Sequence, residues 1–229
     1  MNWIFTTLQW YLVLLALGII FYPLTRKFFH SFFDHGYAFA KTIGILLLSY
    51  IMFFLGTVKL LPFTQASLIF LVGVFAIISF VIARRGKTKQ SEKGLLHFVR
   101  NDKVLLRILI FEEILFLASL FFLVYIRGQE PSIRGLEKFM DFGFMNSILR
   151  SRFFPALDIW YSGDITNPSG HPINYYYFGH LTGALLIKLS GIKASLGYNL
   201  LLATIFAQGV TLTFSLISNL VYFHKKVSL

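Results

Sequence analysis

Two carboxylates spaced one helical turn apart are the residues of this chain best suited to chemistry. Glu137 and Asp141 stand four positions apart in a polar stretch, residues 127–180, that lies between strongly apolar segments. On a helix, side chains with this spacing are neighbours on one face. Such a pair can share a divalent cation, or one carboxylate can act as a general base that the other supports. The alternative is a solvated face on which Arg134 and Lys138 neutralise the two acids.

The stretch around these carboxylates has the periodicity of an amphipathic helix. This pattern predicts a helix over Ile133–Met145 that lies on the membrane surface instead of crossing the membrane. We expect its charged face to point toward a cavity and its apolar face toward lipid or helix ends. The two faces carry Arg134, Glu137, Lys138 and Asp141 on one side, and Leu136, Phe139, Met140 and Gly143 on the other.

Three consecutive tyrosines stand in the run INYYYFGH, at the mouth of a later apolar segment. Their rings can stack on a sugar, and their hydroxyls can hydrogen-bond to a sugar or to a lipid phosphate. The alternative is a belt of aromatic side chains at the membrane interface. At the end of the run, His180 is either a phosphate partner or an interfacial histidine that is satisfied within the protein.

The segment between the predicted surface helix and the tyrosines, residues 150–174, is predicted to be an irregular loop. Its prolines and glycines interrupt both helix and strand. Long loops of this kind are usually functional or disordered, and the aromatic content argues against disorder. We therefore expect the loop to contribute to a binding site. The candidate binding residues of the whole stretch are Arg127, Arg134, Lys138, Asp158, Trp160, Asn174, Tyr175, Tyr176, Tyr177 and His180.

Composition indicates the class of protein that must position these residues. Mean hydropathy is +0.70, and only 14% of the residues are charged, against about 25% in a soluble domain. The absence of cysteine excludes disulfides and thiolate metal sites. We predict an all-α membrane protein with three parts: residues 1–126, an extracytoplasmic loop over 127–174, and residues 175–229. The six apolar stretches that predict membrane helices are Trp3–Tyr22, Ala38–Leu61, Gln65–Ala83, Val104–Ile126, Tyr175–Leu189, which is short, and Leu196–Tyr222.

Positive charge gathers on one side of these predicted helices. Pro23 is expected to end the first helix. The loops 23–37 and 84–103, with Lys41 counted among them, carry ten of the 21 lysines and arginines. The positive-inside rule places both loops in the cytoplasm and residues 127–174 outside. This charge pattern indicates topology and attraction to anionic lipid, so nucleic acid is not an expected partner. Lys225 and Lys226 conflict with six crossings, unless the helix over Tyr175–Leu189 is re-entrant or further chain follows.

Two carboxylates also fall within a predicted membrane helix. Glu112 and Glu113 lie in Val104–Ile126. Intramembrane carboxylates are costly, and they indicate function by default. The alternative is that they lie near the cytoplasmic end and form ion pairs with Arg107 or with a neighbouring helix, which would stabilise the bundle.

Taken in order, the runs DHGYAFAKTIGILLLSY, EEILFL, EKFMDFGFMNSILRSRFFPALDIWYSG and INYYYFGH resemble the bacterial and archaeal YYY-domain membrane proteins. That family is named for its tyrosine triplet and is largely uncharacterised. The resemblance covers nearly the whole chain. The chain departs from the family pattern at Phe139, where proline is expected, and at Pro155–Trp160, where a more proline-rich run is expected. Neither departure removes a charged residue.

The resemblance implies a function like that of C-type glycosyltransferases, which are polytopic enzymes of the prokaryotic plasma membrane. They take a sugar from a polyprenyl-phosphate carrier, so a polyprenyl-phosphate-linked sugar and membrane lipid are the implied partners. Asp141 would act as general base or metal-bound acid, supported by Glu137. Arginine and lysine side chains would neutralise the carrier phosphate. The resemblance is to the N-terminal portion of longer proteins, which implies a C-terminal half encoded downstream.

Two other functions remain open. The chain could be a non-catalytic membrane module of a split or truncated protein, which would scaffold a partner. It could also be a small transporter in which Glu112, Glu113 and His180 form a proton relay. Transporters commonly contain internal repeats, and none is recognisable here. A downstream reading frame encoding further apolar helices would favour the split enzyme.

Overall fold

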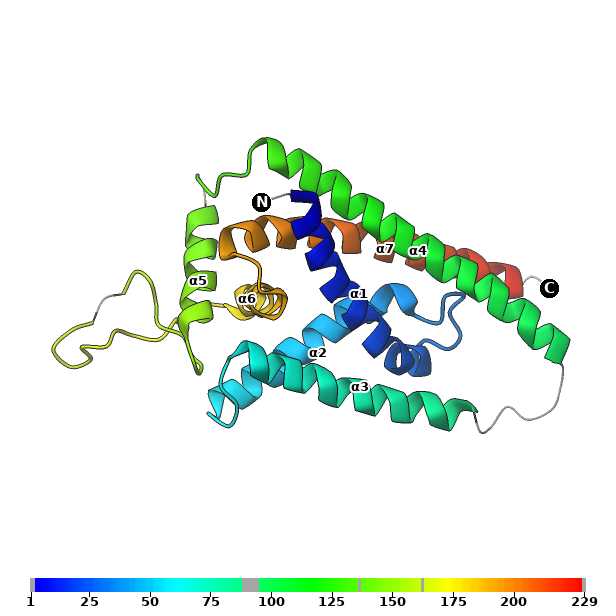
Figure 1. The fold of residues 1–229 in the computed structure, drawn as a ribbon, viewed down its shortest axis with the longest axis horizontal. Helices are drawn as coiled ribbons and strands as arrows, with labels where there is room; N and C mark the ends of the chain where they lie inside the picture. The colour runs from blue at the N-terminus through cyan, green and yellow to red at the C-terminus, as the bar shows by residue number, and fades with distance from the viewer. Residues whose placement is uncertain (1–2, 88–94, 136, 162, 228–229) are drawn as a thin grey trace. The chain divides into compact units, whose positions relative to one another are not determined.

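A computed structural model describes residues 3–87, 95–135, 137–161 and 163–227 of the chain, and α-helices are the regular elements of these residues. The prediction of an all-α protein is therefore confirmed. The isolated bridge between Leu157 and Pro172 is the one β-type pairing in this part of the chain. The helices, drawn in Figure 1, are α1 (Trp3–Phe28), α2 (Tyr37–Thr57), α3 (Gln65–Lys87), α4 (Leu95–Gln129), α5 (Lys138–Arg150), α6 (Phe178–Ser190) and α7 (Ala194–Val227).

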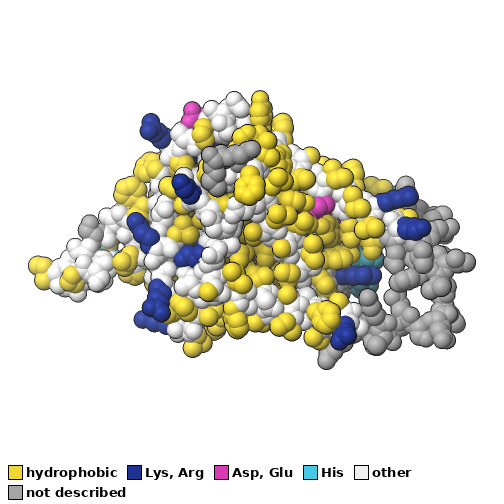
Figure 2. All heavy atoms as spheres, viewed as in Figure 1, with side chains coloured by type: hydrophobic (Ala, Val, Ile, Leu, Met, Phe, Trp, Pro, Cys, Tyr) yellow, Lys and Arg dark blue, Asp and Glu magenta, His cyan; other side chains and the backbone are white. Residues whose placement is uncertain are grey.

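Five of the helices are long and apolar enough to cross a membrane, counted over the described residues. They are α1, α2, α3, α4 and α7. Hydrophobic side chains cover much of the surface in Figure 2, and many large ones are more than half exposed. A soluble protein rarely exposes such extended apolar surface. The chain is therefore an integral membrane protein whose helices present this surface to lipid.

The structure differs from the prediction of a sixth spanning helix over Tyr175–Leu189. Helix α6 has 13 residues, which corresponds to about 20 Å of helix against about 30 Å of hydrocarbon. The tyrosines precede this helix instead of forming its first turn, and Gly191, with φ of 70°, ends it in the left-handed region. Most apolar side chains of α6 are buried in protein. The apolar residues of α6 therefore serve packing inside the protein and not contact with lipid.

Counting only these five helices as membrane crossings also removes the conflict in the distribution of positive charge. With α6 outside the count, the end of α7, which holds Lys225 and Lys226, returns to the side of the two basic loops. This is the arrangement that the positive-inside rule favours. Residues 88–94 of the second basic loop lie outside the described residues.

Two predicted helix boundaries are wrong. Pro23 lies inside α1, which continues to Phe28, because helices in a membrane tolerate proline when neighbouring groups satisfy the freed carbonyl. The predicted surface helix over Ile133–Met145 begins only at Lys138 and continues to Arg150. Gly135 has φ of 77°, a left-handed conformation that interrupts a helix. The charged turn before α5 is therefore not helical.

The chain divides into two compact units, each assembled from separate segments. The first unit contains Met1–Val13, Ile45–Val72 and Arg127–Leu201, and it holds the whole polar stretch. The second unit contains Leu14–Gly44, Gly73–Ile126 and Leu202–Leu229, and it holds Glu112 and Glu113. Within the first unit, α5 packs against α6, and the irregular segment 151–177 extends away from α5 (Figure 1).

The segment after α5 is fixed to the turn between α2 and α3. The backbone N–H of Phe63 donates to the Arg152 carbonyl at 2.7 Å, and that of Phe154 donates to the Gly56 carbonyl at 3.3 Å. The rings of Phe63 and Phe154 lie 5.2 Å apart, and both are almost fully buried. A Cβ at Gly56 would stand 2.6 Å from the Phe154 ring. The absence of a side chain at Gly56 permits this close approach.

Candidate functional site

The packing of α5 on α6 brings together Asp141 and His180. The Nε2 of His180 lies 3.1 Å from Oδ1 of Asp141. A carboxylate oxygen accepts, so this ring nitrogen carries the proton and donates. The side chain of Asp141 is 35% exposed and that of His180 is 16% exposed. Asp141 is thus the member of the pair that faces outward.

Three aromatic side chains, Phe144, Tyr175 and Tyr176, lie next to this pair. Phe144 is buried and packs its ring edge-on against His180 and stacked on Tyr175, each with centroids 5.6 Å apart. The rings of Tyr175 and Tyr176 stack at 3.9 Å, and the Tyr175 hydroxyl donates to the Tyr176 hydroxyl at 2.6 Å. Tyr176 is 79% exposed. A flat, accessible pair of rings therefore stands beside Asp141.

The predicted carboxylate pair acts on the same tyrosine. The hydrogen bond to Tyr176 is the largest cause that raises the pKa of Tyr175 to about 12, and the charges of Glu137 and Asp141 contribute. Both carboxylates therefore lie within electrostatic range of the Tyr175 hydroxyl. Glu137 is exposed and immediately precedes α5, and its carbonyl accepts the backbone N–H of Asp141 at 2.9 Å.

The third tyrosine has a different environment. Tyr177 immediately precedes α6, and its ring lies 6.1 Å from that of Phe53 in α2. Burial raises the pKa of its hydroxyl. Tyr175 and Tyr176 form the exposed stack, whereas Tyr177 packs α6 against α2.

The structure does not show the described basic side chains of residues 127–138 gathered around one point, as neutralisation of one phosphate would require. Arg127 ends α4 and donates to the carbonyls of Glu130 and Ser132, the second at 2.7 Å, so its guanidinium already stabilises the following turn. Arg134 is exposed on the irregular backbone before α5, and Lys138 is half-buried at the first residue of α5. Their contact with a phosphate stays a prediction.

The loop residues Asp158 and Trp160 shape the loop itself. The Oδ1 of Asp158 accepts the backbone N–H groups of Trp160 at 2.7 Å and of Tyr161 at 3.2 Å. The Trp160 ring is exposed and meets Phe139 edge-on at 5.9 Å. Beside this turn, a half-open cavity of about 490 Å³ is lined by Pro155, Asp158, Tyr161, His171, Pro172, Ile173 and Asn174.

Asp164 organises the tip of the loop, and the sequence reasoning missed this role. Its Oδ1 accepts from the hydroxyl and backbone N–H of Thr166 and from the backbone N–H of Asn167, and its Oδ2 lies 3.1 Å from Nε2 of His171. These hydrogen bonds, led by that of Thr166, lower the pKa of Asp164 to about 2. The His171 ring also packs on Tyr161 at 4.2 Å. The signal was an aspartate with Thr two positions later and Asn three positions later, a spacing typical of an Asx turn.

Two further residues of the first unit were not predicted. Tyr198 of α7 is buried edge-on to Phe142 at 5.8 Å, within electrostatic range of Asp141 and Arg127. Lys188 of α6 donates to the carbonyls of Phe63 and Leu149, both at 2.8 Å. Within the described residues, no three His, Asp or Glu side chains gather closely enough to hold a metal ion.

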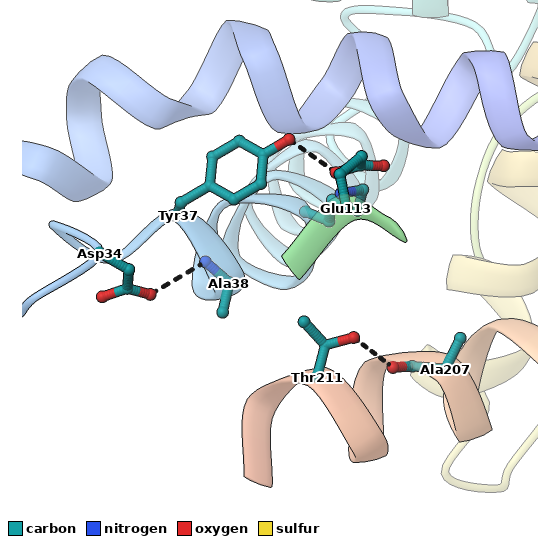
Figure 3. Close-up of polar contacts among 7 residues, drawn as sticks. Asp34, Tyr37, Ala38, Glu113, Ala207 and Thr211 are labelled. Atoms are coloured by element: carbon teal, nitrogen blue, oxygen red, sulfur yellow. Dashed lines mark hydrogen bonds and ion pairs between the residues drawn. The ribbon is translucent and has the colours of Figure 1, made fainter. Parts of the chain in front are cut away.

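The intramembrane carboxylates belong to the second unit. Glu113 accepts from the Lys41 ammonium at 2.5 Å and from the Tyr37 hydroxyl at 2.6 Å, the second bond being visible in Figure 3. This is the predicted alternative of an ion pair with a neighbouring helix. Lys41 was counted among the loop charges, and that assignment is wrong. It lies in α2, is 5% exposed, and neutralises a carboxylate.

The helices define a polytopic membrane protein, and the candidate site, which is aromatic and acidic, lies on α5, α6 and the irregular segment between them. Residues 47–228 match the model of a family described as "Uncharacterized membrane protein (DUF2298)". The match covers most of the chain, so the chain belongs to this family, in agreement with the resemblance to YYY-domain proteins. No curated protein and no solved structure matches the chain.

Proposed function

We propose that this chain takes part in sugar transfer from a polyprenyl-phosphate carrier, at the extracytoplasmic face of the prokaryotic plasma membrane. The observation that carries the proposal is the Asp141–His180 pair, which lies beside the exposed stack of Tyr175 and Tyr176. A carboxylate held by a histidine can take a proton from an acceptor hydroxyl. Exposed aromatic rings offer an apolar face to a sugar and hydroxyls to its polar edge.

The geometry favours Asp141 over His180 as the general base. His180 directs Nε2 at Asp141, and its Nδ1 is buried, with no hydrogen-bond partner among the described residues. The imidazole therefore has no accessible nitrogen for an acceptor. Asp141 is more exposed and uses Oδ1 for His180, which leaves Oδ2 for the acceptor hydroxyl. His180 is then a positioning residue that orients the carboxylate.

The donor phosphate would lie where charge and aromatic rings meet. Lys138 and Arg134 flank Glu137 at the start of α5, and a lysine or arginine can neutralise a phosphate oxygen. A divalent cation would take Glu137 and Asp141 as two ligands and obtain the rest from donor phosphates and water, which is how Mg²⁺ is commonly held. The loop cavity that contains Asp158 and Asn174 offers room for the acceptor.

The test is sugar transfer from a polyprenyl-phosphate donor by membranes that contain this chain together with the product of any downstream frame. We expect Asp141→Asn to lower the rate by about 10²–10⁴-fold, the usual effect of losing a general base. The matched control is Glu130→Gln, because Glu130 is exposed and, within the described part of the chain, its carboxylate accepts hydrogen bonds only from nearby Ser132. Equal rates for Asp141→Asn and the unmutated chain would remove Asp141 from the mechanism.

The same assay separates an enzyme from a non-catalytic module. A module would bind the polyprenyl phosphate but would transfer no sugar, even with the downstream product present. Loss of binding in a Tyr175→Ala, Tyr176→Ala double variant, without any transfer by the unmutated proteins, would favour the module. Transfer that depends on Asp141 would favour the enzyme.

A further inference from the structure

The second unit contains three acidic side chains whose hydrogen bonds differ sharply. Asp34, just before α2, is fully buried. Its carboxylate accepts the backbone N–H groups of Gly36 at 3.0 Å and Ala38 at 3.4 Å, together with the Ser215 hydroxyl of α7 at 2.9 Å. Figure 3 shows the bond to Ala38. Three donors and the start of a helix stabilise the ionised form of a carboxyl group.

Glu113 is also supplied with donors. The ammonium of Lys41 and the hydroxyl of Tyr37 both donate to its Oε2. Lys41 further lies over the rings of Tyr37 and Phe116, at 5.1 and 4.6 Å from their centroids. The positive charge of Lys41 is therefore committed to Glu113, and this pair is neutral as a whole.

Glu112 has no comparable support. It is 0% exposed, and neither of its carboxyl oxygens receives a hydrogen bond from a donor in the described part of the chain. Its carboxyl group lies within hydrogen-bonding reach of the Asp34 carboxyl. Two buried, adjacent carboxylates without a donor between them would be strongly unfavourable, because an isolated ion loses its hydration and repels its neighbour. One added proton removes both costs.

We propose that Glu112 and Asp34 together bind one proton where α4 meets the turn before α2. Glu112 carries it as a carboxylic acid, and its O–H donates to the Asp34 carboxylate. The proton comes from a hydronium ion of the surrounding water: one O–H bond of the hydronium ion breaks as the O–H bond of Glu112 forms, and a water molecule is released. This gives the chain a proton-binding site distinct from Asp141 and His180.

The groups that face this site support the assignment. Tyr22 of α1 lies within electrostatic range of both Asp34 and Glu112, and its hydroxyl is buried with no hydrogen-bond partner among the described residues. Arg26, one turn later in α1, is within range of Tyr22, but it is exposed. From α7, Ser215 donates to Asp34, and Asn219 donates to Ser215. None of these groups provides a buried cation for Glu112. Lys41 is buried and within electrostatic range of Glu112, but its ammonium is bonded to Glu113.

Infrared spectroscopy of the purified full chain, at neutral pH in H₂O and D₂O, tests the proposal. A protonated carboxyl group gives a C=O stretching band that shifts on deuteration and that carboxylates lack. We expect this band in the unmutated chain and in Glu113→Gln, which changes the adjacent residue of the same helix. We expect its loss in Glu112→Gln, in which a neutral amide replaces the acid and can still donate to Asp34.

Two results would overturn the proposal. One is a band that persists in Glu112→Gln. The other is the absence of the band in the unmutated chain. If the thermal stability of that chain then rises with added Na⁺, a bound cation takes the place of the proton. If Glu112→Gln fails to fold, Asp34→Asn provides the second readout. It removes the charged acceptor of the proton, so the acid band must change frequency, and an unchanged band would refute the pair.

Discussion

Replacing Lys188 by methionine should destabilise the first unit more than the same replacement of any other lysine in that unit. Lys188 donates to the carbonyls of Phe63 in the α2–α3 turn and Leu149 in α5, each at 2.8 Å, and its ammonium lies 4.1 Å from the Phe63 ring centroid. Methionine keeps the apolar stem but leaves two carbonyls without a donor. Each such loss costs about 1–3 kcal/mol. Because Lys188 is only half-buried, water can hydrogen-bond to the two carbonyls in part and reduce this loss. We therefore expect Lys188→Met to lower the free energy of unfolding by roughly 2–4 kcal/mol in total.

The assay is thermal unfolding of the purified protein, with Lys193→Met as control, since Lys193 is exposed just after α6. For a chain of this size, 2–4 kcal/mol corresponds to a Tm lower by about 4–16 °C. Burial also lowers the pKa of Lys188 from 10.5 in the folded chain, so the unfolded chain binds that proton more tightly. The advantage of the unmutated chain over Lys188→Met should therefore grow as pH rises toward 10.5. Equal Tm values for Lys188→Met and Lys193→Met would refute this reasoning.

Two further predictions concern topology and the loop. A cysteine introduced at Ser132 should react with an impermeant reagent in intact cells, whereas cysteines at Ser91 and Ser228 should not, because five crossings place both on the cytoplasmic side; labelling at Ser91 alone would invert the topology. The pKa of Asp164 is lowered from 3.8 to about 2, so its hydrogen bonds stabilise the loop above pH 3.8 and are lost as pH falls toward 2. Pepsin cleavage within residues 151–177 should accelerate over that range in the unmutated chain and should show no such step in Asp164→Asn; identical profiles would contradict the role of Asp164.

The spanning helices could be predicted because their signal is local. About 20 consecutive apolar residues suffice to mark a membrane helix, and the five observed spans overlap five predicted stretches. Their ends could not be predicted as well, because α4 and α7 continue as helices into polar sequence at their ends. Helix α6 was misjudged for a different reason. A buried helix and a lipid-facing helix have the same apolar composition, and only tertiary packing separates them.

The members of the candidate site could be named from the sequence, but their pairing could not. Asp141 and His180 are 39 residues apart, and no periodicity links α5 to α6. Conversely, residues whose types suggested binding turned out to stabilise turns, as Arg127 does after α4 and Asp158 does in the loop. A carboxylate or guanidinium can serve a backbone as well as a ligand. Its residue type alone does not separate the two roles.

Two of the sequence runs that carry the family resemblance meet in the first unit. EKFMD supplies Glu137 and Asp141, and NYYYFGH supplies Tyr175 and His180. Asp141 contacts His180 directly, and both carboxylates act on the Tyr175 hydroxyl. Between the runs, the chain forms a loop whose own hydrogen bonds hold its shape, so the loop can place the runs together without taking part in their contact. This convergence gives a physical reason for the two runs to occur in one protein, because each provides what the other lacks: charge from α5, and aromatic surface with an orienting imidazole from the start of α6.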